Sequence, residues 1–342
     1  MTDLLLAVDG GNSKTDVALL GADGVVVAAA RGGTVSHQQV GNRASGERLR
    51  ALVDEAAAAA GITLSSPATT LGVLCLAGAD SAAEERLLHS IHGATRLAAT
   101  LVVENDTIAG LRAGSAVGWG VGVVVGQGIN AVGVAPDGRR ARFAGLGAIS
   151  GDRGGGSGLG MDTLGAAVRA QDGRGPRTAL QQAVPDYFGV RRPLDVTLAL
   201  YGGRLHEERI AELARVAVDA ALAGDAVALT LIDDLADECA AFATASIRRL
   251  RLARLEVPVV LAGGVARGAG ALLVDRVATR VRAVAPRAQI SVLHAPPVVG
   301  AALLALDRVA PGVSATQDNV RSTLTDERFT AARARPRRET GR

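Results

Sequence analysis

Lysine, cysteine and aromatic residues are all scarce in this 342-residue chain. Of the 37 Lys and Arg residues only Lys14 is a lysine, and aromatic residues make up 2% of the sequence. So few aromatic residues argue against recognition of single-stranded nucleic acid by base stacking. The two cysteines, Cys75 and Cys239, are too few for a disulfide framework or for a four-cysteine metal site within one chain. We therefore expect neither a cysteine-rich scaffold nor a nucleic-acid partner.

The net charge of +3 gives little further support for a nucleic-acid partner, because the excess lies at one end of the chain. Residues 311–342 contain seven arginines and four acidic residues, and the rest of the chain is balanced. We expect this basic segment to be a disordered tail. Because the rest of the chain has no net charge, it must bind any anionic ligand through individual charged or polar groups at the site.

The chain carries 48% hydrophobic residues but no pattern that predicts a membrane partner. Its N-terminus lacks a basic flank followed by an apolar core, so we expect no signal peptide. Residues 113–136 are uncharged over a length that could span a bilayer, but the seven glycines among them favour buried strands around a turn. We expect a cytoplasmic protein.

Apolar runs and turn residues recur in the same order in the two halves of the chain. Three predicted strands joined by short turns open each half, at 4–8, 16–20 and 25–30, and again at 118–125, 129–134 and 140–144. Helices and strands then alternate, so the order β-β-β-α-β-α-β-α occurs twice. This pattern predicts a duplicated mixed α/β fold with a boundary near residues 108–116 and a ligand cleft between its halves.

The first turn, Asp9-Gly10-Gly11-Asn12-Ser13-Lys14-Thr15, has the composition of an anion site. Adjacent glycines let backbone N–H groups converge on an anion, and a carboxylate at a strand end can orient Mg²⁺ through waters. The turn is not a P-loop, because Ser13 stands where that motif requires glycine. A plain glycine hairpin is the alternative. Codon bias accounts for the scarcity of lysine but not for the position of Lys14, which we expect near a bound phosphate.

Three more glycine-rich segments lie at the ends of predicted strands. Gly126-Gln127-Gly128-Ile129-Asn130 occupies the equivalent turn of the second half, so the two turns could hold a polyphosphate from both sides. Gly263-Gly264 lies between a strand and a helix, where the missing side chains would let a flat base approach the backbone. The loop 145–158 contains one acid, Asp152, and could close over a substrate. Each segment could instead be an ordinary turn or a flexible loop.

Asp106 is the candidate general base. It follows Glu104-Asn105 at the end of a predicted buried strand and begins a helix. There its carboxylate could accept a proton from a substrate hydroxyl, or it could serve only as a helix cap. His37 follows the third strand, where a side chain could contact a ligand. His89 and His92 have no acidic or cysteine partner nearby in sequence, so we expect no histidine metal site.

Taken in order, these motifs resemble the BadF/BadG/BcrA/BcrD-type ATPase family of the sugar kinase/actin/Hsc70 superfamily, and within it the N-acetylglucosamine kinases. The resemblance covers about residues 4–308. It implies an α/β fold of two ribonuclease-H-like, actin-like ATPase domains with an interdomain nucleotide cleft, which we place at residues 1–112 and 113–310, before the tail at 311–342. It also implies that the protein uses ATP and Mg²⁺ and that its small-molecule partner is an amino sugar. Relatives of this kind suggest that a homodimer is possible.

The resemblance implies a role for each matching position. Asp106 is the expected catalytic base on the sugar 6-hydroxyl, and Asp9 is the expected metal ligand. The expected nucleotide-binding residues are Asp9, Gly10, Gly11, Asn12, Lys14, Thr15, Gly126, Gln127, Gly128, Gly263 and Gly264. The expected sugar-binding residues are Ser36, His37, Asn105, Asp106, Asn130 and Asp152.

The chain departs from the family pattern at several of these motifs. Gln127 replaces a threonine of the second phosphate motif, Leu146 replaces an aromatic residue of the sugar loop, and Arg153 stands where an acid is common. An asparagine that recognises the sugar in relatives falls at Ser36 or His37. We therefore expect nucleotide binding, with the acceptor open between N-acetylglucosamine, glucosamine and another hexosamine.

Two functions of other classes stay open beside the kinase. An ATP-driven activator of a redox partner would need cysteines that ligate a shared iron–sulfur cluster, and Cys75 and Cys239 lie in a predicted buried strand and a predicted helix without nearby mates. A non-catalytic nucleotide switch like actin would not need Asp106 and Asp152 beside substrate loops. The kinase is the leading hypothesis.

Overall fold

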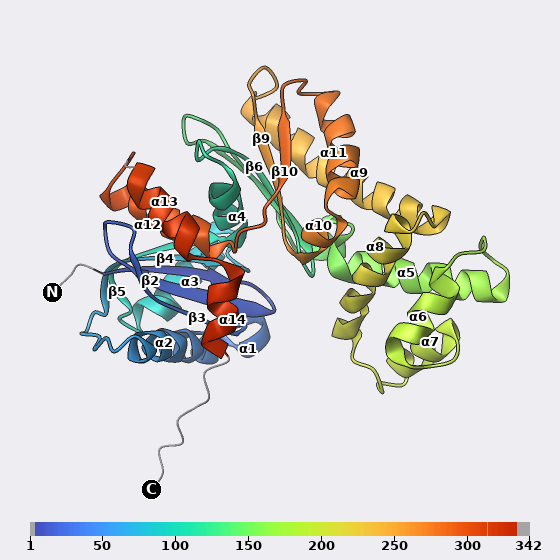
Figure 1. Cartoon of the computed structure of the whole chain (residues 1–342), viewed down its shortest axis with the longest axis horizontal. Coiled ribbons are helices and arrows are strands. Elements are labelled where there is room, and N and C mark those ends of the chain that lie inside the picture. The colour runs from blue at the N-terminus through green and yellow to red at the C-terminus, as the bar shows by residue number, and fades with distance from the viewer. Residues whose placement is uncertain (1–3, 313, 334–342) are drawn as a thin grey trace, which may run out of the picture. The chain divides into compact units, whose positions relative to one another are not determined.

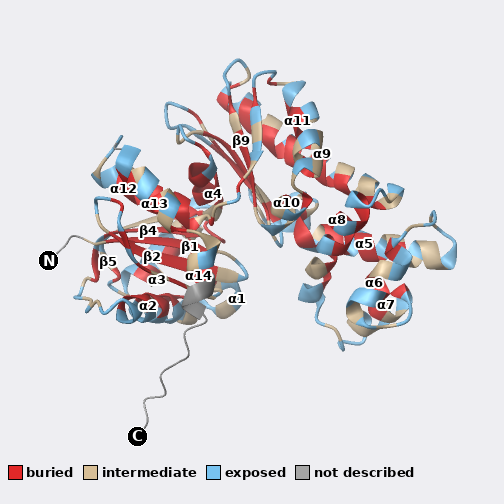
Figure 2. Ribbon diagram, in the orientation of Figure 1, coloured by how far each residue is buried: buried red, intermediate tan, exposed pale blue. Residues whose placement is uncertain are grey.

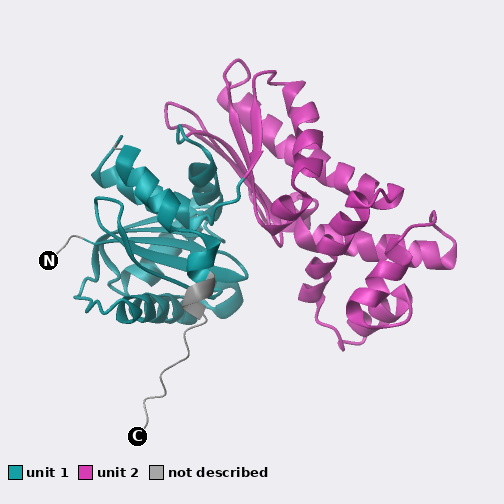
Figure 3. Ribbon diagram, in the orientation of Figure 1, with its two compact units in different colours: residues 1–118, 293–342 teal, residues 119–292 magenta. Residues whose placement is uncertain are grey.

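The computed structural model describes residues 4–312 and 314–333 (Figure 1). The chain forms two compact units, of which unit 1 contains residues 1–118 and 293–342 and unit 2 contains residues 119–292 (Figure 3). These units differ from the predicted domains, in which residues 293–310 belong to the second domain. The chain returns to unit 1 after residue 292, and α12 (Val298–Val309) packs against α4 (Asp106–Gly114).

The sheet of unit 1 has the strand order β3-β2-β1-β4-β5. Neighbours among β1, β2 and β3 are antiparallel, whereas β4 runs parallel to β1 and β5 runs parallel to β4. The central strand β1 is buried at every position, which accounts for its nearly continuous apolar sequence. The bounds are β1 Leu5–Gly10, β2 Lys14–Leu20, β3 Val26–Gly33, β4 Thr69–Leu76 and β5 Ala98–Asn105.

The sheet of unit 2 repeats this arrangement, with the order β8-β7-β6-β9-β10. Again the first three strands of the unit are antiparallel neighbours and the last two are parallel. The predicted duplication and the mixed α/β class are therefore confirmed. The bounds are β6 Gly120–Val125, β7 Ile129–Val134, β8 Arg140–Arg142, β9 Pro258–Ala262 and β10 Gln289–Val292.

Helices follow the strands in both units. Those of unit 1 are α1 His37–Val40, α2 Asn42–Ala59, α3 Ala82–Gly93, α4, α12, α13 Ser314–Thr323 and α14 Asp326–Arg333. Those of unit 2 are the 3₁₀ helices η1 Gly147–Ser150 and η2 Glu207–Glu212 and the α-helices α5 Gly155–Asp172, α6 Leu180–Phe188, α7 Pro193–Tyr201, α8 Leu213–Leu222, α9 Ala226–Leu250, α10 Gly264–Ala269 and α11 Ala271–Arg282. Within residues 4–312 and 314–333, none of the helices combines the length and apolar character that a membrane span requires.

Local sequence signals explain which helices could be predicted. A capping box, which the spacing of Ser81 and Glu84 predicts, begins α3: the Ser81 hydroxyl accepts from the Glu84 backbone N–H, and the Glu84 carboxylate accepts from the Ser81 N–H. In contrast, α6 and α7 were not predicted. Pro185 lies inside α6 and Pro193 begins α7, so prolines interrupt the helical pattern along this part of the chain.

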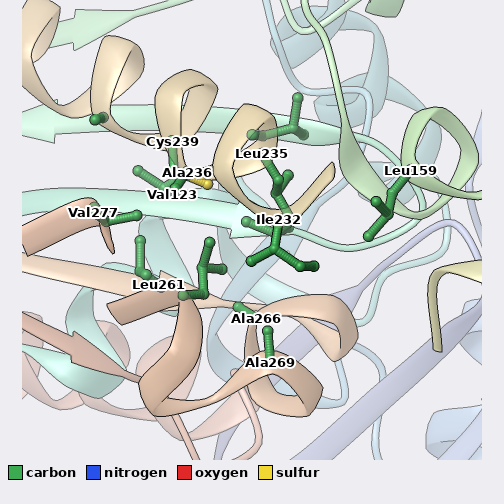
Figure 4. Close-up of a cluster of buried hydrophobic side chains, with 14 of the residues drawn as sticks. Val123, Leu159, Ile232, Leu235, Ala236, Cys239, Leu261, Ala266, Ala269 and Val277 are labelled. Carbon is green, nitrogen blue, oxygen red and sulfur yellow. The ribbon is translucent and has the colours of Figure 1, made fainter. Parts of the chain in front are cut away.

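Each unit has its own hydrophobic core. In unit 1 the core includes Leu6 of β1 and Leu49 of α2, both fully buried. In unit 2 Val123 of β6 and Leu261 of β9 meet Ile232 and Cys239 of α9 (Figure 4). Buried residues are concentrated in the sheets and on the helix faces that cover them (Figure 2). The cores hold the strand ends, where the predicted motifs lie, in fixed register.

The contact between α12 and α4 has a steric and an electrostatic basis. A Cβ on Gly300 would lie 1.9 Å from the carbonyl oxygen of Ala109, so glycine is required where the two helices cross. Asp307 accepts two hydrogen bonds from Arg112, at 2.8 and 3.0 Å, and Arg112 is itself buried. Partners so far apart in sequence give no local signal, so the domain boundary could not be drawn correctly from the sequence.

Residues 314–333 also differ from the disordered tail that composition suggested. They form α13 and α14. Val320, Leu324 and Phe329 are at most 1% exposed, so a few apolar residues anchor an otherwise polar segment. The average composition of the segment conceals these positions. The end of the predicted tail, residues 334–342, lies outside the described residues.

Candidate active site

A row of polar residues crosses the sheet of unit 1 near the carboxyl end of β1. Asp9 of β1 pairs with Asp16 of β2, and Asp16 pairs with Arg31 of β3. In the other direction Asp9 pairs with Cys75 of β4, and Cys75 pairs with Glu104 of β5. Residues opposite one another on neighbouring strands share a face of the sheet. Three acids and an arginine therefore lie on one face beside the predicted phosphate turn.

Asp16 is the most strongly held acid of this row. It is fully buried and accepts hydrogen bonds from Arg31 Nε at 2.6 Å and Arg31 Nη2 at 2.8 Å. The ammonium of Lys14 lies 3.7 Å from the same carboxylate. A bidentate arginine pair is the strong form of such a contact, and it compensates the burial of the charge. The sequence analysis missed Asp16 and Arg31, although the pairing of β1 with β2 through a short turn could have placed Asp16 opposite Asp9.

Asp9 has no comparable compensation. Burial and the nearby carboxylates of Asp16 and Asp106 raise the pKa of Asp9 well above its usual value, and Lys14 and Arg31 lower it only in part. A carboxylate held among other acids is stabilised by an added positive charge. The donor set of this turn is therefore suited to a hard cation that oxygen ligands hold.

The first glycine turn is closed by its own backbone. The N–H of Gly11 donates to the carbonyl of Lys14 at 2.9 Å, and the Thr34 hydroxyl donates to the Gly11 carbonyl at 2.9 Å. A Cβ on Gly10 would lie 2.6 Å from Leu76 Cδ2, so the turn packs tightly against β4. Asn12 is exposed at its tip, and Thr15 is buried at the start of β2.

Asp106 begins α4, and its neighbours fix it there. The side-chain oxygen Oδ1 of Asn105 accepts from the N–H and the hydroxyl of Thr107, and its side-chain nitrogen Nδ2 donates to Asp80 at 2.8 Å. Asn105 is thus the helix cap, and Asp80, which the sequence analysis missed, orients the cap. Burial raises the pKa of Asp106 to about 6, although backbone N–H groups at the helix start act in the opposite direction. A carboxylate with a pKa near neutrality is well matched to proton transfer.

Ser36 and His37 follow β3 in the same unit. Ser36 is 3% exposed, and among the described residues its hydroxyl has no hydrogen-bond partner. The Nδ1 atom of His37 is likewise buried without a partner in this part of the chain, and the ring lies against Gly78. Buried polar atoms without partners are uncommon in folded proteins and mark positions where a ligand or water could bind.

In unit 2 three glycine segments meet at one end of the sheet. The N–H groups of Gly156 and Ser157 donate to the carbonyls of Gly126 and Gln127, at 2.7 and 2.9 Å. Gly155 is so close to this turn that a Cβ would lie 2.5 Å from the carbonyl carbon of Gly128. The loop before α5 and the second glycine turn are therefore packed together.

The third segment reaches the same place from β9. Gly263 has a φ of 101°, and a Cβ there would lie 2.3 Å from the Val125 carbonyl oxygen and 3.0 Å from the Gly126 nitrogen. Among the described residues, no atom outside the adjacent residues and the backbone of its own helix lies within 4 Å of the corresponding position on Gly264, which begins α10. The structure thus brings the predicted second phosphate turn and the predicted adenosine segment together.

The two predicted sugar-binding residues of unit 2 lie on and beside the glycine loop. A Cβ on Gly145 would lie 2.4 Å from Asn130 Nδ2, so the loop starts against the Asn130 amide. The Asp152 carboxylate accepts from the Gly147 N–H at 3.0 Å and from the Ser150 hydroxyl at 2.6 Å. Asp152 therefore orders η1, and its contact with a sugar stays a prediction.

The comparison with known protein families decides what kind of protein carries these motifs. The model of the BadF/BadG/BcrA/BcrD ATPase family matches residues 6–305. The chain belongs to this family. Membership of the BadF/BadG/BcrA/BcrD ATPase family implies the use of ATP, and it agrees with two duplicated α/β units that carry glycine turns at their strand ends.

Several characterised or solved proteins resemble this family member over most of its length. An N-acetylmuramic acid/N-acetylglucosamine kinase of Clostridium acetobutylicum is 26% identical over 76% of this chain and 85% of its own. An N-acetyl-D-glucosamine kinase of Dictyostelium discoideum is 25% identical over 89% of this chain and 98% of its own. A crystal structure from Chromobacterium violaceum, assigned as an N-acetylglucosamine kinase, matches with a TM-score of 0.66 at 25% identity over 89% of this chain and 99% of its own.

A more distant structure shows the same fold. A ROK family glucokinase from Streptomyces griseus, solved with glucose and AMPPNP, matches 88% of this chain and 99% of its own with a TM-score of 0.52 at 18% identity. These structures and the two matching sheets confirm the predicted duplicated α/β fold.

The cysteines of this family member lie in the interior. Cys75 and Cys239 are both fully buried, and burial raises the pKa of each thiol. A cluster shared between subunits requires thiolates at a surface. The buried positions give no support to the hypothesis of a redox-partner activator.

Proposed function

We propose that the protein is an ATP-dependent kinase that transfers the γ-phosphoryl group to the 6-hydroxyl of an amino sugar, with N-acetylglucosamine as the acceptor. The observation that carries the proposal is the Asp106 carboxyl, which is fixed at the start of α4 with a pKa of about 6 in a chain of an ATPase family. The kinases named for N-acetylglucosamine among its relatives support this acceptor class. A kinase that uses ATP is expected to act in the cytoplasm.

Each residue of the proposed site has a task that its position can support. Asp106 accepts the proton of the attacking 6-hydroxyl, and the Asn105 cap keeps the carboxylate at the helix start. The buried polar atoms of Ser36 and His37 bind the sugar, as do Asn130 and Asp152 beside the glycine loop. Since phosphoryl transfer depends mainly on positioning and charge neutralisation, fixed groups of this kind supply most of the rate enhancement.

The nucleotide is assigned to the glycine turns. The backbone around Gly10, Gly11 and Asn12, with Lys14 and Thr15, receives phosphate oxygens in unit 1. In unit 2 the segment formed by Gly126, Gln127 and Gly128 receives phosphate oxygens, and Gly263 and Gly264 receive the adenosine. Glycines suit both tasks because no Cβ blocks the approach of the ligand to backbone N–H groups.

Mg²⁺ fits the acids of unit 1. No group of three or more His, Cys, Asp or Glu in the described ranges is arranged to hold a metal by itself. That agrees with Mg²⁺, which proteins usually bind through one or two carboxylates together with waters and substrate phosphates. Asp9, buried beside Asp16 and Asp106, is the residue that would hold it. When bound, Mg²⁺ neutralises charge on the transferring phosphates.

An acceptor panel tests the proposed function. ADP release is measured with ATP and N-acetylglucosamine, glucosamine, N-acetylmannosamine or N-acetylmuramic acid, and the sugar products are identified by mass spectrometry. We expect N-acetylglucosamine to give the highest kcat/KM. Higher values for glucosamine or another hexosamine would reassign the acceptor, and ADP release at the ATP-only rate with every sugar would contradict the kinase.

The pH dependence follows from the protonation of the proposed base. Only the charged Asp106 carboxylate can accept a proton, and its pKa is raised to about 6. We therefore expect kcat to fall as the pH is lowered through about 6. A profile of kcat between pH 5 and 8 measures this limb. A rate that stays constant to pH 5 would contradict the assignment of Asp106 as base.

Lys14 offers a test of the first turn. Its ammonium already contacts Asp16, whose carboxylate is occupied by the Arg31 fork. A guanidinium is larger and planar, so Lys14→Arg is expected to weaken ATP binding about fivefold. Calorimetry with a non-hydrolysable ATP analogue measures the change, with Arg43→Lys at an exposed position of α2 as the control. Unchanged affinity and turnover in Lys14→Arg would mean that the single lysine has no role in phosphate binding.

A further inference from the structure

The segment of α13 and α14 lies beyond the residues that the family model matches. The family match ends at residue 305, whereas these helices span Ser314–Thr323 and Asp326–Arg333. The segment is nonetheless packed into unit 1, where α13 contacts α12 and β3 and α14 contacts β3. Figure 1 shows α14 lying against β3.

Backbone acceptors of unit 1 hold the segment in place. Asn319 donates to the Asp23 carbonyl at 3.1 Å, and Arg321 donates to the Ala113 carbonyl at 2.7 Å. Arg328 of α14 donates to the Val26 carbonyl at 3.1 Å, at the start of β3. These contacts join the segment to the β2–β3 hairpin, to α4 and to β3, so the segment is fixed at several points.

The decisive contact is with Arg31 of β3. Its Nη2 donates to Asp326 at 2.9 Å, and its guanidinium lies 4.8 Å from the centre of the Phe329 ring. Phe329 is fully buried, so the ring is a fixed surface. The same guanidinium makes the bidentate pair with Asp16. α14 thus supplies a carboxylate and an aromatic face that hold Arg31 in the orientation that pairs with Asp16.

Asp16 connects this contact to the phosphate turn. It lies opposite Asp9 on the neighbouring strand, and its carboxylate is 3.7 Å from the Lys14 ammonium. If Arg31 moved away, Lys14 would be the remaining ion-pair partner of the buried Asp16 carboxylate among the described residues, and Lys14 would be drawn toward it. The position of Arg31 therefore affects how Lys14 and the turn are presented to an anion.

We propose that α14 is a positioning element of the nucleotide site, because Asp326 and Phe329 hold Arg31 against Asp16 and thereby keep the turn Gly10–Lys14 ready for phosphate. Asp326 and Phe329 are positioning residues and not catalytic ones. The inference rests on the proposed function only in its premise that this turn binds the phosphates of ATP.

Two point variants test the inference without removing the helix. Asp326→Asn removes the ionic contact with Arg31, and Phe329→Leu removes the ring face. We expect each to weaken binding of a non-hydrolysable ATP analogue about five- to tenfold, since coupled positions change affinities on this order. The KM for ATP should rise while the KM for the sugar stays the same. Asp326→Glu, which keeps the negative charge, should retain the wild-type analogue affinity and the wild-type KM for ATP.

The direction of the effect separates positioning from simple charge. Asp326→Asn removes a negative charge from unit 1, which by electrostatics alone would strengthen the binding of an anionic nucleotide. Weaker binding in this variant therefore supports positioning. The matched control is Glu47→Gln, which breaks the exposed Arg43–Glu47 pair on α2 and should leave affinity unchanged.

The outcomes also separate the inference from the proposed function. Unfolding midpoints are recorded for every variant, and if Phe329→Leu fails to fold, Asp326→Asn decides alone. Wild-type affinity in a folded Asp326→Asn protein would overturn the inference. Failure of the wild-type protein to bind the analogue would overturn it too. A wild-type protein that binds the analogue but phosphorylates no sugar would overturn the proposed function alone.

Discussion

Asp106→Asn is expected to lower kcat by about 10²- to 10⁴-fold, the usual contribution of a general base. Asparagine has nearly the same shape as aspartate, so the α4 start and the Asn105 cap should persist. It cannot accept the hydroxyl proton. The affinity for a non-hydrolysable ATP analogue should change by less than about twofold, because only the proton-accepting step has been removed.

A matched variant shows whether the loss is specific to Asp106. Asp54→Asn changes an exposed acid on α2 that pairs only with its neighbour Arg50 in the described contacts, and it should retain wild-type kcat. The measurements are kcat from ADP release, analogue affinity by calorimetry and the unfolding midpoint. Turnover by Asp106→Asn near the wild-type rate would contradict its role as base. Loss of analogue binding together with turnover would indicate a structural role instead.

Gly263→Ala is expected to destabilise the protein by about 3 kcal/mol and to abolish nucleotide binding. The backbone at Gly263 has a φ of 101°, a region that L-residues rarely adopt, and the added Cβ would lie 2.3 Å from the Val125 carbonyl oxygen. That carbonyl and the adjacent Gly126 belong to the second phosphate turn. The substitution should therefore displace β9 and the turn from one another.

Gly264→Ala is the matched control because the two glycines are adjacent and only one is crowded. In the described part of the chain, no atom beyond the adjacent residues and the local helix backbone lies within 4 Å of the added Cβ, and alanine favours a helix start more than glycine does. Thermal unfolding should show Gly264→Ala at wild-type stability. Because Gly264 is proposed to receive the adenosine, calorimetry should show weaker binding of the ATP analogue by this variant. Equal stability of both variants would contradict the packing described for Gly263.

The repeated fold was predictable from local patterns. Glycine turns and apolar runs gave the order of strands in both units, because short turns between adjacent strands fix an antiparallel register. The capping box at Ser81 and Glu84 likewise marked the start of α3. These features depend on residues close together in sequence, so no tertiary information was needed.

Features that depend on distant contacts could not be predicted in this way. The return of α12 to unit 1 requires Gly300 to meet α4 and Asp307 to meet Arg112. The burial of Phe329 beside Arg31 was concealed by the polar composition of its segment. Neither contact has a signal within one stretch of sequence, since each joins residues about 190 or more positions apart.

The residues of the candidate site also divide into those with a local sequence signal and those that depend on distant contacts. The sequence motifs predicted Asp9, Asp106 and the glycine turns as site residues, because these motifs are short and local. Asp16 and Arg31 were missed because their importance comes from cross-strand pairing with Asp9. Asp80 was missed because it acts through the Asn105 side chain, 25 residues away. Contacts between a site residue and a neighbouring strand or loop are seen only in the three-dimensional structure.

The most direct measurement compares N-acetylglucosamine with its 6-deoxy analogue as acceptors for the wild-type protein. Both sugars present the same acetamido group and ring hydroxyls, and only the first has the hydroxyl that Asp106 is proposed to deprotonate. We predict one ADP and one sugar phosphate per turnover with N-acetylglucosamine, and the ATP-only rate with the 6-deoxy analogue. Equal ADP release with both sugars, or ADP release without a phosphorylated sugar, would contradict transfer to the 6-hydroxyl.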